Sequence, residues 1–487
     1  MRHPHPAARA ASALALVVAV LLPPLAVGAT TKVDPPIVSG TPRVIRAIGP
    51  SPLDVDLRDL PSEGRIGPRR GGYVPVGEPP AFAGLRTRRH HPDRVAIPTG
   101  RPTRMMATQA FTTPERSWEG QTGGFPTDPN GDIGPNHYIQ MVNSTFQIYD
   151  KDGNALLLDG IGNPDPMNIN QIWDGFTGQC EDTNRGDPIV LYDQLADRWL
   201  LSQFAFDRMN IDADPALESV PPWFECVAIS QGPNPVTDGW FRYAIQSPDL
   251  YFPDYPKLGI WPDAYYLTTV QTGGQGGGNY ALDRVSMLAG GPANAIYFDT
   301  HAGPYNDERL LPVDMEGFTS PGAGDPGLFM RPDDANDDIE IWEFHADFGN
   351  PGASTFGLAQ SIGTAFDSSA GGAPQPTDDE LIETIADRFL HRATYRVVGG
   401  VERLLAQNLV DVDNTNHGGI RWYELARIAG VWVIAQQGDH APDTDHRWNA
   451  SLAMDRDGNL ALGYSVSSAS TFPSIRYAGR LAGDPLN

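Results

Sequence analysis

Acidic side chains recur where buried strands are expected to begin, and carboxylates are common general acids, bases and nucleophiles. Asp187, Asp254 and Asp387 each stand at or just before an apolar run. If these runs converge on one axis, their carboxylates form an acid–base site, and they are the candidate catalytic residues if the chain is an enzyme. The ordinary alternative is that each Asp caps the turn before its strand.

Basic residues occupy similar positions and would suit an anionic ligand group. The candidate ligand-binding residues are Arg185, Arg388, His446 and Arg447.

A second group of acidic residues has the spacing of calcium ligands. Asp128, Asn130 and Asp132 alternate along the chain, as do Asp455 and Asp457 before Gly458. Calcium takes six to eight oxygen ligands, which closely spaced Asp and Asn supply, so Ca²⁺ is the expected cofactor. A D-G-N sequence between strands is also typical of a hairpin turn, and no EF-hand Glu closes these loops.

Two apolar runs joined by an Asp-rich turn, from Gly186 to Phe204, are typical of a buried β-hairpin. Similar hairpins begin near 132, 187, 256, 326, 388 and 449, at intervals of 55, 69, 70, 62 and 61 residues. Such a repeat predicts an all-β fold, a single β-propeller of six blades. Seven blades stay an alternative if residues 300–325 contain a further blade. Only 377–390 has helical spacing.

The domain organisation follows composition. Residues 1–29 have the pattern of a signal peptide cleaved after Ala29, so we expect a secreted or periplasmic protein. Residues 30–110 form a Pro-rich, basic arm, expected to be a largely irregular linker or pro-segment. The propeller domain is 111–487, with 20 Lys and Arg against 53 Asp and Glu, a net charge of −33. This charge disfavours nucleic acid. No segment after the signal predicts a membrane span, and we expect a monomer.

The two cysteines, Cys180 and Cys226, are separated by 46 residues. An even number in an exported chain predicts a disulfide between them. Four tryptophans near expected loops, Trp173, Trp223, Trp240 and Trp448, are candidates for a sugar-stacking surface. The sequence contains no G-x-S-x-G, HExxH or Walker motif.

Four strings carry a resemblance: DPIVLYDQLADRW, DYPKLGIWPDAYYLT, RWNASLAMDRDGNLALGYSVSS and SIRYAGRL. Together they resemble a family of exported bacterial β-propeller proteins with no assigned activity, over about 115–485. The nearest known shape is the sialidase-like six-bladed propeller. The S-x-D-x-G-x-T-W box of sialidases is absent, and residues 453–464 resemble it only distantly.

Two functions of different classes fit these observations. We expect a secreted, acidic, calcium-stabilised propeller that binds a glycan or a cell-surface partner. The alternative is a sialidase-like glycan-processing enzyme, a hydrolase or lyase, that uses the carboxylates at the propeller mouth. Binding is favoured because no nucleophile motif is present and propellers host many functions.

Calcium binding predicts a stability change. An ion that binds the folded loops and hardly the unfolded chain stabilises the fold by ~2.7 kcal/mol at a hundred times its Kd. A chelator should therefore lower the melting temperature, and Asp132→Ala should remove part of the difference if the first loop is the site. Sodium chloride at matched ionic strength is the control. Unchanged melting with chelator in low salt would reduce the acidic loops to turns and solvated surface.

Overall fold

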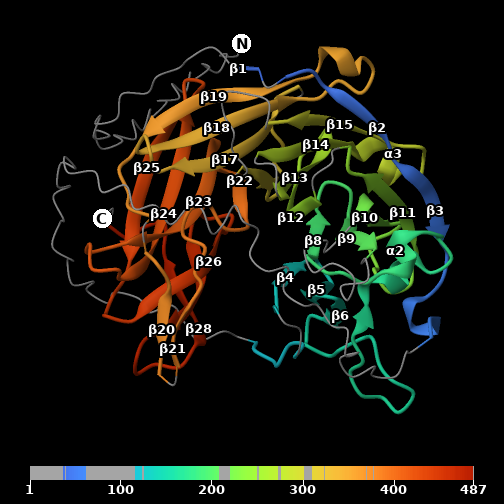
Figure 1. Ribbon diagram of the computed structural model, residues 1–487, viewed down its shortest axis with the longest axis horizontal. Helices are drawn as coiled ribbons and strands as arrows, with labels where there is room; N and C mark the ends of the chain where they lie inside the picture. The colour runs from blue at the N-terminus through green and yellow to red at the C-terminus, as the bar shows by residue number, and fades with distance from the viewer. Residues whose placement is uncertain are drawn as a thin grey trace, which may run out of the picture.

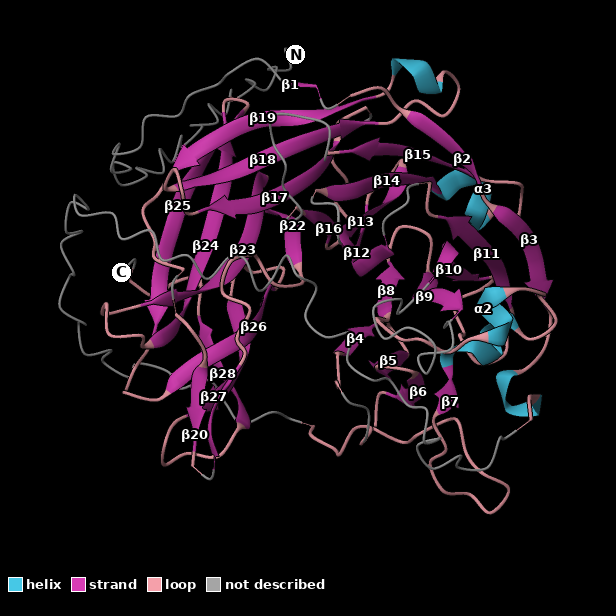
Figure 2. Cartoon of the chain, in the orientation of Figure 1, coloured by secondary structure: helices cyan, strands magenta, loops and turns pink. Residues whose placement is uncertain are grey.

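In the computed structural model the chain folds into sheets of mostly antiparallel strands in a propeller-like arrangement (Figure 1). The structure describes residues 37–38, 40–61, 116–122, 126–207, 220–248, 252–272, 276–300, 310–322, 324–368, 370–376 and 378–485. Nearly all of its regular structure is strand (Figure 2), so the all-β prediction is confirmed. The described helices are short: η1 (Leu57–Asp59), η2 (Ile169–Trp173), α2 (Gln179–Asp182), α3 (Arg284–Leu288) and η3 (Pro351–Ala353).

Three sheets follow in chain order, each beginning with its innermost strand. The first has four strands: β4 (Pro129–Ile133), β5 (His137–Val142), β6 (Thr145–Asp150) and β7 (Met167–Asn168). The second contains β8 (Ile189–Asp193), β9 (Arg198–Asp207), β10 (Val220–Ser230) and β11 (Trp240–Gln246). The third contains β12 (Phe252–Ile260), β13 (Ala264–Thr272), β14 (Gly277–Asp283) and β15 (Asn294–Asp299).

Eight of the ten strands from β16 to β25 belong to one larger sheet. Parallel pairing of β16 with β22 joins two four-stranded units. One unit is β16 (Leu311–Met315), β17 (Gly327–Asp333), β18 (Asp338–His345) and β19 (Thr355–Gly363). The other is β22 (Ala393–Val398), β23 (Val401–Asp411), β24 (Gly418–Ile428) and β25 (Val431–His440). Two small sheets complete the fold: β20 (Ala373–Gln375) with β21 (Asp378–Ile382), and β26 (His446–Met454), β27 (Leu460–Ser467) and β28 (Ser474–Arg480).

The predicted propeller-like arrangement is confirmed, whereas the number of blades stays a prediction. Five of the six predicted hairpins contain the innermost strand of a sheet or of a sheet half. The fourth, near 326, is instead β17 with β18, and its inner neighbour is β16. The parallel β16–β22 pairing merges two expected blades into one sheet, which a count of hairpins does not anticipate.

The structure describes 37–38 and 40–61 of the basic arm, and three short strands form there, where the sequence predicts a largely irregular segment. β3 (Ile48–Leu53), β2 (Arg43–Arg46) and β1 (Ile37–Val38) pair with the outer strands β11, β15 and β19. The blue segment of Figure 1 follows these outer edges. Unpaired strand edges offer hydrogen bonds to any extended segment, and local periodicity does not report this pairing. Residues 1–36 and 62–115, including the predicted signal peptide, lie outside the described residues.

The helix expected at 377–390 is also absent from its described part. Residues 378–382 form β21, which pairs with β20, and a turn follows. A helical apolar stripe needs a surface to pack on, and Leu381 is 52% exposed here.

The cores lie between neighbouring sheets. Leu201 of β9, for example, packs with Ile139 and Met141 of β5, whereas Leu200 packs with Leu258 of β12. Trp173, Trp223 and Trp240 are buried in these cores, so they do not form the predicted sugar surface. Trp448 is half-buried, and its indole N–H donates to Ser467 at 3.2 Å.

The predicted disulfide is confirmed. Cys180 in α2 and Cys226 in β10 are bonded, with their Cα atoms 5.8 Å apart. Closing a loop of this length stabilises the fold by about 3–4 kcal/mol because it restricts the unfolded chain.

One buried arginine connects the innermost strands. The Arg392 guanidinium pairs with Asp314 at 2.9 Å, Glu316 at 3.0 Å and Asp132 at 3.2 Å. These residues lie in or next to β22, β16 and β4. The carboxylates reach further, because Asp132 accepts the Tyr192 N–H of β8 and Asp314 accepts the Ile260 N–H of β12. We call Arg392, Asp132, Asp314 and Glu316 the axial ion cluster.

Removing the cation of this cluster should destabilise the protein strongly. In Arg392→Met three carboxyls of low exposure lose their counter-charge, which typically costs about 3–5 kcal/mol. Denaturant unfolding measures this difference. Arg456→Met is the matched control because that side chain is 85% exposed, so its unfolding free energy should change by less than about 0.5 kcal/mol. Equal stability of the two variants would contradict a central role for Arg392.

Candidate functional site

Three acidic residues meet where the first three sheets approach the axis. Asp128 directly precedes β4, Asp187 lies two residues before β8, and Asp254 lies within β12 at a β-bulge. The backbone is left-handed at Asp128 (φ 37°), Asp187 (φ 48°) and Tyr255 (φ 51°), and a proline follows each of them. Such conformations cost on the order of 1–3 kcal/mol in a non-glycine residue and cluster at functional sites.

The carboxyls of Asp187 and Asp254 lie together around one amide. The Tyr255 N–H donates to Asp254 Oδ1 at 2.9 Å and also interacts with the Asp187 carboxyl. Burial, then the charges of Asp254 and Asp128, raise the pKa of Asp187 to about 8. Burial raises the pKa of Asp254 only to about 6, because the Tyr255 N–H and the Lys257 charge favour its ionised form. Asp128 is exposed, yet the surrounding protein raises its pKa as well.

A fourth carboxyl, Glu225 of β10, was not predicted. Glu225 is 2% exposed, and neither of its carboxylate oxygens has a hydrogen-bond partner among the described residues. Its pKa is raised well above the ordinary value by burial and then by Asp187. The sequence did contain a signal, because Glu225 stands between Trp223 and Val227, both buried, on one face of a strand.

Lys257 is a cation whose charge acts on all four of these carboxyls, and it was also not predicted as a site residue. Its Nζ lies 3.6 Å from the centre of the Tyr255 ring and donates to the Pro256 carbonyl at 2.9 Å. Its charge lowers the pKa of Asp128, Asp187, Glu225 and Asp254. We call Asp128, Asp187, Glu225, Asp254 and Lys257 the axial acidic cluster.

Arg388, a predicted ligand-binding residue, borders the same region, where Asp387 forms hydrogen bonds with it. Arg388 is 2% exposed and forms two hydrogen bonds with the Asp387 carboxylate, of 3.1 and 3.4 Å. Its guanidinium lies 5.3 Å from the centre of the Tyr255 ring. Asp387, expected as a third catalytic carboxylate, therefore has an orienting contact with Arg388.

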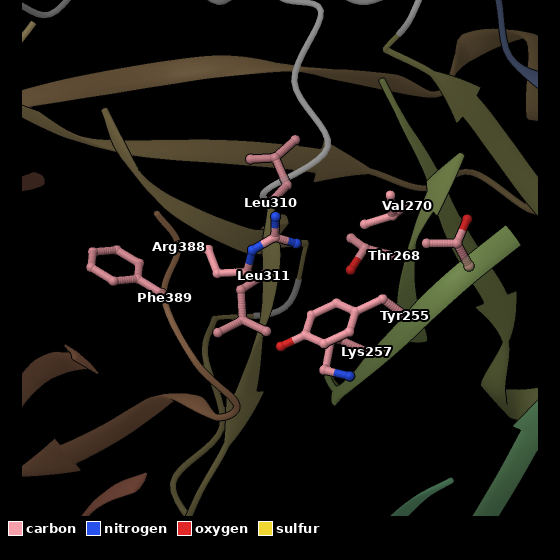
Figure 3. Close-up of a pocket in the computed structure, with 9 residues that line it drawn as sticks. Tyr255, Lys257, Thr268, Val270, Leu310, Leu311, Arg388 and Phe389 are labelled. Atoms are coloured by element: carbon pink, nitrogen blue, oxygen red, sulfur yellow. The ribbon is translucent and has the colours of Figure 1, made fainter. Parts of the chain in front are cut away.

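A small hollow lies beside the cluster (Figure 3). Tyr255, Lys257, Thr268 and Arg388 supply its polar lining, with Leu310, Leu311 and Phe389 among its apolar walls. Its volume of about 10 Å³ admits a single water molecule or one atom group of that size.

The other predicted ligand-binding residues have different partners. Arg185 donates from Nε to the Phe206 carbonyl at 2.9 Å and lies over that ring. His446 accepts the Gly418 N–H at 3.2 Å, and burial lowers its pKa. Arg447 is 1% exposed and pairs with Asp443 at 2.8 Å. His446 and Arg447 belong to β26, which packs on β23 and β24.

Two predicted calcium ligands in the first segment, Asn130 and Asp132, lie on strand β4. Their side chains accept the backbone N–H groups of Val190 and Tyr192 in β8, at 2.7 and 2.8 Å. Because Asp132 also pairs with Arg392, Asp132→Ala would disturb the axial ion cluster as well as any calcium site.

Asp455 belongs to a turn that occurs three times, as D-x-x-G-N at 150–154, 159–163 and 455–459. In each, the Asp carboxylate accepts the N–H groups two and four residues on, and the Asn side-chain amide. Asp457 is exposed in the third turn. Among the described residues no group of three or more His, Cys, Asp or Glu has metal-binding geometry. Calcium binding stays a prediction.

Comparison with known proteins gives structural likeness only. No known protein family and no curated protein matches the sequence. An endo-arabinase from Bacteroides thetaiotaomicron VPI-5482 aligns over 62% of this chain and 95% of its own, with 16% identity and a TM-score of 0.30. The WD40 domain of SCAP from fission yeast aligns over 72% and 74%, with 10% identity and a TM-score of 0.28. A GH43 β-1,3-galactosidase aligns over 73% and 88%, with 10% identity and a TM-score of 0.21. Similarity at this level assigns no activity to the chain.

The pairing of Asp187 with Asp254 predicts a coupled titration. Replacing Asp254 by Asn removes a neighbouring negative charge, so the pKa of Asp187 should fall from about 8 towards its ordinary value of 3.8. Carboxyl ¹³C NMR during a pH titration measures the shift. Asp457→Asn, in an exposed turn, should leave the Asp187 titration unchanged. An Asp187 pKa that ignores Asp254 would separate the two groups.

Proposed function

We propose that this chain is a glycan-processing enzyme, a glycoside hydrolase whose acid–base pair is Asp187 and Asp254. The observation that carries the proposal is that both carboxyls interact with the Tyr255 N–H and that the charge of Asp254 raises the pKa of Asp187. Pairs of carboxyls whose environments separate their pKa values are the usual source of an acid and a base in one site.

The roles follow from the two pKa values. At neutral pH Asp187, with a pKa of about 8, holds its proton and serves as the general acid that protonates the leaving oxygen. Asp254, with a pKa of about 6, is ionised and serves as the base or nucleophile. Glycoside hydrolysis needs this combination of one protonated and one ionised carboxyl. Lys257 contributes positive charge that favours the ionised state of Asp254.

A binding module is the second candidate. The observation in its favour is the small hollow beside the cluster, whose volume of about 10 Å³ seats no whole sugar ring. In that case the Tyr255 ring and the cations beside it would contact a glycan or cell-surface partner without chemistry.

We also propose six blades, bound calcium, a monomeric state and export by a cleaved signal peptide. The Cys180–Cys226 disulfide supports export, because such bonds persist in oxidising compartments. No helix among the described residues is long and apolar enough to cross a membrane.

A panel of chromogenic aryl glycosides tests the enzyme proposal. The wild type should cleave at least one, and Asp187→Asn and Asp254→Asn should each lower kcat/KM by about 10²–10⁴-fold. For the cleaved substrate, kcat/KM should rise through an apparent pKa of about 6 as Asp254 ionises. It should fall again above about 8 as Asp187 loses its proton.

Glu119→Gln, at an exposed position outside every predicted site, is the control for these variants and should keep wild-type activity. Binding on a glycan array without cleavage of any glycoside would instead favour the binding module. Full activity in Asp187→Asn and Asp254→Asn would remove both residues from the mechanism.

A further inference from the structure

The hollow beside the axial acidic cluster has a polarity opposite to that of the cluster. Lys257 and Arg388 are the charged residues in its lining, and none of its lining residues is acidic. Thr268 and Tyr255 add hydroxyl groups, which donate hydrogen bonds. In Figure 3 Arg388 and Thr268 face each other across the hollow, and the Tyr255 ring lies below both. A cavity lined in this way suits a small anionic group.

Arg388 is held in a fixed orientation for such a group. The Asp387 carboxylate takes hydrogen bonds from Nε and one Nη, and the Tyr255 ring packs beneath the guanidinium. Because Arg388 is 2% exposed, a ligand group that reaches it meets a largely desolvated cation. Charge-assisted hydrogen bonds are strongest in such surroundings.

Lys257 supplies the second cation. Its Nζ donates to the Pro256 carbonyl, and among the described residues no carboxylate lies within 4 Å of it. An ammonium has three donors, so Lys257 retains hydrogen-bonding capacity for a ligand. Lys257 lies over the Tyr255 ring and lines the hollow, and its charge also lowers the pKa of Asp187 and Asp254.

We propose that this hollow is a subsite for the carboxylate of an acidic sugar, so that the substrate of the axial site is a uronic-acid-containing glycan. The proposal rests on the proposed function, because it places the sugar ring against Asp187 and Asp254. The size of the hollow favours a carboxylate, whose planar group inserts one oxygen where a tetrahedral sulfate would need more room. The Lys257 and Arg388 cations would then select acidic over neutral sugars.

The surrounding charges give this subsite a pH dependence. Besides each other, the charged or titratable groups that interact with the lining cations Lys257 and Arg388 are Asp128, Asp187, Glu225, Asp254, Asp387 and His391. Ionised Asp187 and Asp254 repel an anion. As the pH falls through their pKa values of about 8 and about 6, this repulsion disappears, while a uronate with an ordinary carboxyl pKa stays ionised above pH 5. Uronate binding should therefore strengthen between pH 7.5 and pH 5.5.

The test is binding of galacturonate and of galactose to the full chain, measured by calorimetry or ligand-detected NMR. Wild-type protein should bind galacturonate about tenfold more tightly than galactose at pH 5.5, as expected for one charge-assisted hydrogen bond. Lys257→Met and Arg388→Lys should each remove most of this preference. The matched control is Arg427→Lys, which changes a second hollow of about 10 Å³ lined by Trp261 and Trp432. It should keep the wild-type preference.

Each outcome bears on one proposal. Equal affinity for the two sugars, absence of galacturonate binding, or a preference that survives Lys257→Met would overturn the subsite. If Arg388→Lys does not fold, Lys257→Met decides, because that side chain is half-buried and makes no ion pair among the described residues. Hydrolysis of neutral glycosides without a uronate preference would overturn the subsite and leave the proposed function. A uronate preference without hydrolysis would do the reverse.

Discussion

The centre of this fold depends on the ion pairs of the largely buried Arg392 guanidinium. Near the axis the inner strands present backbone N–H groups to neighbouring sheets, and these groups need hydrogen-bond acceptors. Asp132 and Asp314 accept such groups from β8 and β12. Their negative charge then needs compensation, which Arg392 provides, and Arg392 also pairs with Glu316. Five inner strands are thereby joined through one cation.

The same constraint explains how the acidic cluster is placed. With the inner ends of β4, β8 and β12 fixed, the residues just before or within them are carried towards one another. Left-handed backbone at Asp128, Asp187 and Tyr255, each followed by a proline, accompanies the approach of the Asp128, Asp187 and Asp254 carboxyls. Like charges in partly desolvated surroundings cost free energy, and no hydrogen bond among the described residues offsets the burial of Glu225. A fold retains such a cost more often at a working site than elsewhere.

Local pattern was sufficient for most strands, because alternation and turn residues determine hairpins directly. The disulfide followed from the even number of cysteines. It was insufficient where pairing is decided by distant partners. The arm strands at 37–53 have no periodicity of their own and form on the exposed edges of β11, β15 and β19. The parallel β16–β22 contact joins segments about eighty residues apart. The stretch 377–390 had helical spacing, yet a two-stranded pairing prevailed in its described part.

The candidate site was predicted in part, and the division has a physical cause. Asp187 and Asp254 stood out because acidic residues before strands are visible in sequence, whereas Lys257, Glu225 and Arg392 lie within or beside apolar runs. A charged residue at a core-facing position is the signal that was overlooked, since burial of an ion is tolerated only where something compensates it. Glu225 lacks such a partner among the described residues, and Lys257 interacts with the carboxyls without a direct ion pair. Buried titratable groups without a direct ion pair therefore indicate the Asp187–Asp254 region more specifically than acidic residues before strands do.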